Sequence, residues 1–191
     1  EQFKRFHQTY YHPSNTRAFF SGDDDPAQRL DILDEYFSQF ERAPVDAEVK
    51  LQPRFNAPRQ VVATYAGTKG EGKARDGMVS VNWMIDTPAD RTEALSHGML
   101  SYLLAGNSAA PLRKALTESG LGEGMTGGGI GAGLRQPMAS FGMKGIDPAD
   151  AGKVEALILS TLKEIAEKGF AIEQLEAAAN TFEFSLRENN T

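Results

Sequence analysis

One local pattern occurs twice in this chain and constrains its fold more than any other feature. The stretches "AFFSGDDDPAQRLDILDEYF" (18–37) and "ASFGMKGIDPADAGKVEALIL" (139–159) each join a strand-like run, a glycine, an Asp-Pro pair and an amphipathic helix. Aspartate is a favoured N-cap, and proline fits the first helical position, where no backbone N–H is needed. Asp25-Pro26 and Asp147-Pro148 therefore predict helix starts. The repeat predicts two copies of one fold, with the first copy cut off at its front.

The residues around the first copy predict a helix, a strand and a second helix. Phe3, Phe6 and Tyr10 recur at i, i+3 and i+7, as on one face of a helix, and Pro13 ends that pattern. The run at 16–20 predicts a short strand. The helix after the Asp25 cap carries apolar residues at helical spacing, namely Leu30, Leu33, Phe37 and Phe40.

Residues 41–60 hold three prolines and show no sustained periodicity, which is typical of a linker. We place a domain boundary near Pro53. Residues 1–53 are then predicted to be the C-terminal tail of a first, catalytic-type domain plus the linker, and residues 54–191 to be a second, non-catalytic α+β domain.

The second part of the chain alternates pairs of strands with pairs of helices. The predicted elements are strands at 61–65 and 79–85 joined by a long turn, helices at 89–105 and 110–119, strands at 123–130 and 136–146, and helices at 147–168 and from Ile172 onward. The order β-β-α-α-β-β-α-α predicts an α+β fold, in which an antiparallel sheet has helices packed on one face.

Composition excludes several classes of protein. With 40% hydrophobic and 24% charged residues, the chain is predicted to be globular, without a membrane-inserted segment. A net charge of -6 without a Lys/Arg stripe argues against a nucleic-acid partner. The absence of cysteine excludes disulfides, thiolate nucleophiles and Cys-type zinc sites. The first residues resemble neither a signal peptide nor a transit segment, so the sequence reads as the middle of a longer chain.

Three histidines are the candidate metal ligands. His7 and His12 are five residues apart with a predicted helix end between them, so they do not share a helix face as i, i+4 zinc ligands do. His97 has Glu93 one turn earlier, where an i, i+4 surface contact is common, but this pair lacks a further ligand. The histidines therefore predict no metal site.

Two other motifs also favour structural roles. Asp23, Asp24 and Asp25 have no EF-hand spacing after them, so helix capping is favoured over binding of calcium or magnesium. Gly122 to Gly127 match G-x-G-x-x-G, but a predicted helix precedes them and a strand follows, the reverse of a dinucleotide-binding turn. The match of G-x-G-x-x-A at Gly127, Gly129 and Ala132 has the same defect. We expect these glycines to let an edge strand bend.

No complete catalytic constellation is present in the sequence. The serines occur without a G-x-S-x-G motif; those considered are Ser96, Ser101, Ser108, Ser119 and Ser140. Composition, periodicity and motifs therefore predict an α+β domain that is part of a larger repeat protein, and they predict no specific activity.

Several stretches resemble the pitrilysin/insulysin family of metallopeptidases. The similar stretches are "FHQTYYHPSNTRAFFSGDDDP" (6–26), "VSVNWMI" (79–85), "SAAPLRKALTESGLGEG" (108–124), "KVEALILSTLKEIAEKGF" (153–170) and "NTFEFSLRENNT" (180–191). The resemblance covers nearly the whole chain. It implies a pitrilysin-type domain from a large zinc enzyme, in which four related α+β domains form two halves that close around a chamber.

The resemblance implies an enzyme that degrades cleaved targeting peptides and other short unstructured peptides in the mitochondrial matrix or the chloroplast stroma, or in both. Its zinc is held by an H-x-x-E-H helix and a later glutamate, with the glutamate of the motif activating water. This chain lacks that motif: "EALSH" (93–97) has the wrong order and no first histidine. The resemblance therefore implies no catalytic, cofactor-binding or metal residue here, an inactive fragment, and zinc bound elsewhere in the parent protein.

Two other functions remain open at this stage. A scaffold subunit of the same fold, like the core subunits of the respiratory cytochrome bc1 complex, would also lack the zinc motif. A nucleotide-binding module would rest on Gly122 to Gly133. The leading hypothesis is the peptidase fragment, whose partners are unstructured peptides and the remaining domains of the same polypeptide.

Overall fold

The computed structural model describes residues 1–66, 75–131 and 134–188. The chain divides into two compact units, Glu1–Lys50 and Leu51–Thr191. The assignment of residues 1–53 to the tail of a separate domain stays a prediction.

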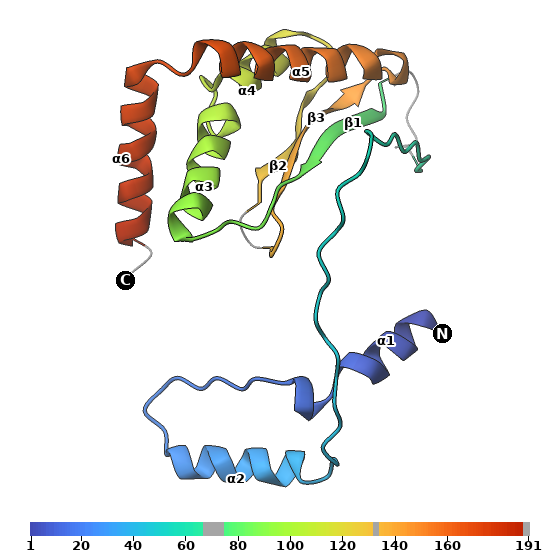
Figure 1. Ribbon diagram of the computed structural model, residues 1–191, viewed down its shortest axis with the longest axis vertical. Coiled ribbons are helices and arrows are strands. Elements are labelled where there is room, and N and C mark those ends of the chain that lie inside the picture. The colour runs from blue at the N-terminus through green and yellow to red at the C-terminus, as the bar shows by residue number, and fades with distance from the viewer. Residues whose placement is uncertain (67–74, 132–133, 189–191) are drawn as a thin grey trace. The chain divides into compact units, whose positions relative to one another are not determined.

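The first unit consists of two helices and a short turn. It contains α1 (Gln2–Tyr10), the 3-10 turn η1 (Pro13–Asn15) and α2 (Pro26–Phe37), as Figure 1 shows. The predicted start of α2 is confirmed, because the Asp25 carboxylate accepts a hydrogen bond from the Ala27 N–H at 2.9 Å. Neither helix has a buried residue. This unit therefore lacks a hydrophobic core of its own among its described residues.

The strand predicted at 16–20 is wrong, because the described structure forms no strand at these residues. Thr16 is extended, with φ -103° and ψ 143°, but residues 16–20 pair with no other strand. Phe19 is 90% exposed. A strand requires a hydrogen-bonded neighbour as well as β-favouring residues, and the described part of this unit supplies none.

The second unit forms a small antiparallel sheet with four helices. Its elements are β1 (Gly77–Met84), α3 (Arg91–Ala105), α4 (Pro111–Glu118), β2 (Gly124–Ile130), β3 (Met138–Ile146), the 3-10 turn η2 (Pro148–Asp150), α5 (Ala151–Lys168) and α6 (Ile172–Glu188). The strand order is β1-β3-β2, and both pairings are antiparallel. The predicted α+β class is confirmed.

The predicted strand at 61–65 is also wrong, so the observed order is β-α-α-β-β-α-α. Val61 and Val62 are almost fully exposed and pair with no described strand. The alternation of apolar residues in this run favours a strand, but a strand forms only where its backbone can hydrogen-bond to a neighbouring strand. Most of the turn predicted to follow it, residues 67–74, lies outside the described residues.

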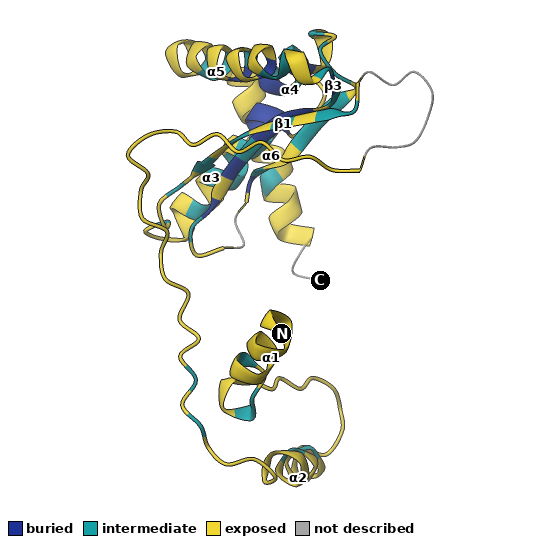
Figure 2. Ribbon diagram, turned by 90° about the vertical axis from the view of Figure 1, so that its right-hand side faces the viewer, coloured by how far each residue is buried: buried dark blue, intermediate teal, exposed yellow. Residues whose placement is uncertain are grey.

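One face of the sheet is apolar and covered by helices. Val79, Val81 and Trp83 of β1 pair across the sheet with Met143, Phe141 and Ala139 of β3, which places their side chains on one face. The same cluster includes residues from three helices: Leu104 of α3, Leu112 and Leu116 of α4, and Val154 and Ile158 of α5. Figure 2 shows the buried positions gathered in this unit, around the sheet and its neighbouring helices. The predicted packing of helices on one face is confirmed.

The opposite face of the sheet is exposed along β1 in the described part of the second unit. On β1 it presents Met78, Ser80, Asn82 and Met84, all exposed. At its centre Ser80 pairs with Gly142 of β3, which pairs with Thr126 of β2. A Cβ atom on Gly142 would collide with the Val79 carbonyl oxygen, so glycine permits this close strand pairing. We call this surface the open face.

The helix that follows Asp147 begins and ends as predicted. The Asp147 carboxylate accepts from the Ala149 N–H at 2.9 Å, and Pro148 occupies the first position. The first turn is the 3-10 turn η2, which leads directly into α5. Gly169, with φ 74°, ends the helix by adopting a backbone conformation that glycine tolerates.

Candidate functional site

The histidines of the first unit have structural partners. The His12 Nδ1 atom accepts a hydrogen bond from the Ser14 N–H at 3.1 Å, so the ring caps η1. The His7 ring stacks on Tyr11 with ring centroids 4.6 Å apart. The His12 ring also meets the Phe40 ring edge-on, with ring centroids 5.7 Å apart. Neither the Ser14 nor the Tyr11 contact brings a second imidazole or a carboxylate next to the histidine ring.

His97 and Glu93 do not form the i, i+4 contact that their spacing suggests. The Glu93 carboxylate accepts from the Ala89 N–H at 2.6 Å, while the Asp90 carboxylate accepts from the Glu93 N–H at 2.9 Å. The Asp90 carboxylate thus caps α3, and Glu93 reaches back to the residue before the cap, close to the pattern of a capping box. The D-x-x-E spacing from Asp90 to Glu93 is a capping signal, and sequence reasoning missed it. The His97 Nδ1 atom is buried and has no hydrogen-bond partner in the described part of the chain.

The aspartate run is used for capping and pairing. Asp25 caps α2, and Asp24 forms an ion pair with Arg29 one turn into that helix. The hydrogen bond from Arg29 lowers the pKa of the Asp24 carboxyl and raises the pKa of the Arg29 guanidinium. No calcium-type ligand arrangement results from these contacts.

The glycine motif lies in a strand rather than at a helix start. Gly122 precedes β2, and Gly124 to Gly127 lie within it. In the described sheet β2 is an edge strand, with an irregular register between Thr126 and Gly129. Gly127 and Gly129 have φ values of 96° and 67°, which accommodate this irregularity. A phosphate-binding turn needs a helix N-terminus after the glycines, and β2 takes that place. Ala132, the last position of the second glycine match, lies outside the described residues.

The described residues do not fit a catalytic zinc. Such a site needs three protein ligands that converge and leave one position open. Within 1–66, 75–131 and 134–188, no group of three or more His, Cys, Asp or Glu side chains could hold a metal ion. These described residues therefore give no support to a reaction at a metal held by this chain.

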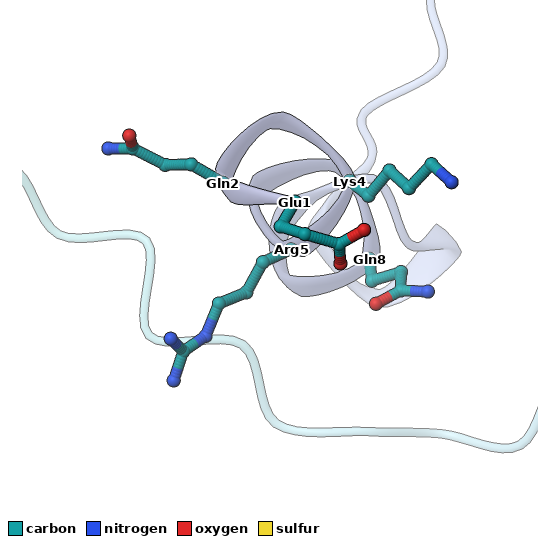
Figure 3. A pocket seen from close by; sticks show the side chains of 5 residues that line it. All are labelled: Glu1, Gln2, Lys4, Arg5 and Gln8. Atoms are coloured by element: carbon teal, nitrogen blue, oxygen red, sulfur yellow. The ribbon is translucent and has the colours of Figure 1, made fainter.

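Two surface hollows of the first unit were candidates for a site. A hollow of about 520 Å³ lies on α1 and is lined by Glu1, Gln2, Lys4, Arg5 and Gln8. Figure 3 shows that Gln2, Lys4 and Arg5 spread outward from the helix in different directions. A smaller hollow of about 310 Å³ lies beside His12 and Phe40. The smaller hollow also contains Ser14, whose Oγ atom accepts a hydrogen bond from the Ala43 N–H at 3.2 Å. The His12 Nδ1 atom accepts from the Ser14 N–H, so the ring is not oriented as a base toward the Ser14 hydroxyl.

Comparison with known families decides the identity of the fold. The description "Peptidase M16 inactive domain" applies to a family model that matches residues 1–182. The chain belongs to the peptidase M16 family. This membership agrees with the absence of an H-x-x-E-H motif from the sequence and with the resemblance drawn from the residues.

Known relatives of this M16 domain are much longer than the chain. Presequence protease 1, chloroplastic/mitochondrial, of Arabidopsis thaliana is 47% identical over the whole chain, which spans 18% of that protein. Protein HypA of Clostridium perfringens is 32% identical over the whole chain, which spans 20% of it. A solved structure of a candidate zinc protease from Bordetella pertussis shares the fold. It has a TM-score of 0.50 and 21% identity over 58% of this chain and 61% of that one.

The M16 domain contains no membrane-crossing helix in its described residues, since none is both long and apolar enough.

Proposed function

We propose that this M16 domain is a non-catalytic part of a zinc metallopeptidase that degrades cleaved targeting peptides and other short unstructured peptides. The observation that carries the proposal is the 47% identity to an Arabidopsis presequence protease, which extends over the whole chain. The match to the inactive domain of the family favours a structural role over a catalytic one. Zinc and its ligands then belong to another part of the parent protein.

The domain's own contribution is to shape the chamber in which peptides are held. Its compact sheet and helices provide a rigid wall, with Phe141, Met143 and Val154 in a closely packed core. Its partners are the peptide substrate and the remaining domains of the same polypeptide. We place the parent protein in the mitochondrial matrix or the chloroplast stroma, where targeting peptides are removed, in keeping with the name of the Arabidopsis relative.

The test uses the whole product of the gene. We expect it to cleave a quenched, unstructured peptide with a targeting-peptide sequence, to lose activity with a chelator, and to recover it with zinc. A folded protein carrying the same peptide sequence in a rigid strand is the control and should resist cleavage. The 191-residue chain alone should give no turnover with or without zinc.

Absence of metal-dependent cleavage by the whole gene product would contradict the proposal. If the encoded sequence also lacked an H-x-x-E-H helix, the scaffold alternative would replace it.

A further inference from the structure

One dipeptide of this chain carries chemistry that the proposed function does not use. Asp76 is followed by Gly77, the first residue of β1. Among the aspartates of the sequence only Asp76 precedes a glycine, and no asparagine precedes one. An aspartate side chain can close a succinimide ring with the backbone nitrogen of the next residue. Glycine favours this reaction, because it has no side chain to obstruct the approach of its nitrogen and its backbone is free to adjust.

Several other aspartates are held in ways that oppose such a ring closure. Asp25 and Asp147 precede prolines, which have no N–H to lose, and their carboxylates cap helices. The Asp90 carboxylate accepts the capping hydrogen bond of α3. Asp31 and Asp34 lie inside α2, where the helical hydrogen bonds fix the backbone.

The environment of Asp76 is different. It lies outside the helices and strands, directly before β1, and is half-buried. The hydrogen bond that the structure gives this residue uses its backbone carbonyl oxygen, which accepts from the Tyr65 hydroxyl. The bond therefore acts on the main chain of Asp76 and leaves the side chain free to turn toward the Gly77 nitrogen.

The hydrogen bond from Tyr65 also acts on the peptide group that reacts. The Asp76 carbonyl and the Gly77 N–H belong to one conjugated peptide unit. A proton donor at the carbonyl oxygen withdraws electron density from the nitrogen and stabilises the anion that forms when the N–H loses its proton. The deprotonated nitrogen is the nucleophile of the ring closure. The Tyr65 hydroxyl therefore assists the formation of that nucleophile.

We infer that Asp76–Gly77 is a modification site at which isoaspartate forms, assisted by the Tyr65 hydroxyl. The Gly77 nitrogen bonds to Cγ of the protonated Asp76 side chain, and the carboxyl hydroxyl leaves with the amide proton as water. Water then opens the succinimide. Attack at the former backbone carbonyl breaks the original peptide bond, so the chain runs through Cγ and a free α-carboxylate remains. Attack at Cγ returns aspartate. This inference does not depend on the proposed peptidase activity.

The fold accommodates the methylene group that isoaspartate adds to the backbone. The ladder between β1 and β3 is irregular at this end, because its register shifts between Gly77 and Met78. Gly145, with φ 66°, is the extra residue of β3 at this shift. From Met78 to Met84 the register is regular. The change lies outside the regular ladder, so we expect β1 to remain paired after modification.

The free α-carboxylate of the product defines the partner of this site. It is the acceptor for an isoaspartyl carboxyl methyltransferase that uses S-adenosylmethionine. The methyl group passes from the sulfonium sulfur to a carboxylate oxygen and leaves S-adenosylhomocysteine. The Gly77 nitrogen then attacks the ester, expels methanol and forms the succinimide again, and part of this succinimide opens to aspartate. Repeated cycles restore the original chain.

The experiment incubates the folded whole gene product in neutral buffer for several weeks and maps the peptide that contains Asp76. Electron-transfer dissociation distinguishes isoaspartate from aspartate, and a sample digested before incubation corrects for modification during digestion. We expect isoaspartate to accumulate at Asp76 and to accept a methyl group from the methyltransferase. Asp86, which is exposed and precedes Thr87, is the internal standard and should stay aspartate.

Three variants of the whole gene product locate the chemistry. Asp76→Glu keeps a carboxylate but requires a larger ring, so the product should be lost. Tyr65→Phe removes the hydroxyl and keeps the aromatic ring, so isoaspartate should form more slowly. Tyr36→Phe is the matched control, because Tyr36 is 64% exposed and Tyr65 is 62% exposed, and it should behave as the wild type. Hydrogen exchange of β3 amides shows whether each variant keeps its sheet.

Three results would overturn the inference. Isoaspartate that forms at Asp76 in guanidinium but not in the folded protein would show that the fold prevents the ring closure. Equal rates at Asp76 and Asp86 would show that the glycine gives no selectivity. Equal rates in the wild type and Tyr65→Phe would remove the assistance by the hydroxyl.

Discussion

At the scale of single residues, the Asp147 cap is the most direct link between sequence and structure. Its carboxylate accepts from the Ala149 N–H at 2.9 Å and begins the η2–α5 segment. We expect Asp147→Ala to lower the free energy of unfolding by about 1 kcal/mol, the usual cost of losing a side-chain cap. Asp147→Asn keeps an oxygen acceptor and should be nearly neutral. Thermal unfolding of the three proteins provides the measurement, and equal midpoints would contradict the capping role.

The Glu164–Lys168 pair predicts a small pH dependence of stability. The Lys168 Nζ atom lies 2.6 Å from the Glu164 carboxylate and lowers the pKa of that carboxyl below its ordinary value of 4.5. A lowered pKa in the folded state means that the stabilisation is present above 4.5 and is lost as the pH falls through the folded-state pKa. Both side chains are exposed, so the effect is small and salt-sensitive.

The test compares the wild type with Lys168→Gln by urea unfolding. The variant should be slightly less stable near neutral pH, and the difference should shrink in strong acid and at high salt. Some difference should remain in acid, because Lys168 lies in the last turn of α5, where a positive charge also interacts with the helix C-terminus. Lys163→Gln is the control, because the Lys163–Glu167 distance is 3.9 Å and the pair is weaker. A difference that does not shrink in acid would contradict an effect of this ion pair.

At the scale of elements, Gly142 and Gly152 predict opposite effects of the same substitution. A Cβ on Gly142 would collide with the Val79 carbonyl oxygen, so Gly142→Ala should separate β1 from β3 and cost at least about 2 kcal/mol. A Cβ on Gly152, inside α5, would meet no atom within 4 Å. Gly152→Ala should therefore stabilise the domain by up to about 1 kcal/mol, the helix-propensity difference. Denaturant unfolding of both variants checks the sign of each change.

The helices could be predicted from sequence more fully than the strands could. The Asp-Pro caps and the spacing of Leu30 and Leu33 act within a few residues, so they define α2 locally. The runs at 16–20 and 61–65 have residues that favour strands but lack a described partner, which local sequence cannot reveal. For the candidate site, the capping of α2 by Asp25 could be predicted from neighbouring residues. The capping of α3 by Asp90, with Glu93 reaching back to Ala89, was missed because the same glutamate also suited a contact with His97.

At the scale of the whole molecule, the segment between the two units should be the first to be cut by a protease. Residues 41–60 contain no helix or strand and are almost all exposed. In limited proteolysis with trypsin we expect the first cuts at Arg42, Lys50, Arg54 or Arg59, which leave the second unit as a resistant product. Mass spectrometry of the products identifies the sites. First cuts within α5 would contradict both the linker and the packing of that helix.

The open face has a consequence for oxidation. Because the chain contains no cysteine, its sulfur atoms all belong to methionine, a side chain that oxidises readily to the sulfoxide. Met78, Met84 and Met138 are 56%, 48% and 43% exposed, whereas Met143 on the covered side of the same sheet is fully buried. Under mild peroxide treatment, sulfoxide should form at the three exposed methionines first and at Met143 only when the core opens, as peptide mass spectrometry can follow. The exposed methionines of the open face thus react with oxidant before the core does, and oxidation of Met143 reports that the covered side of the sheet has become accessible.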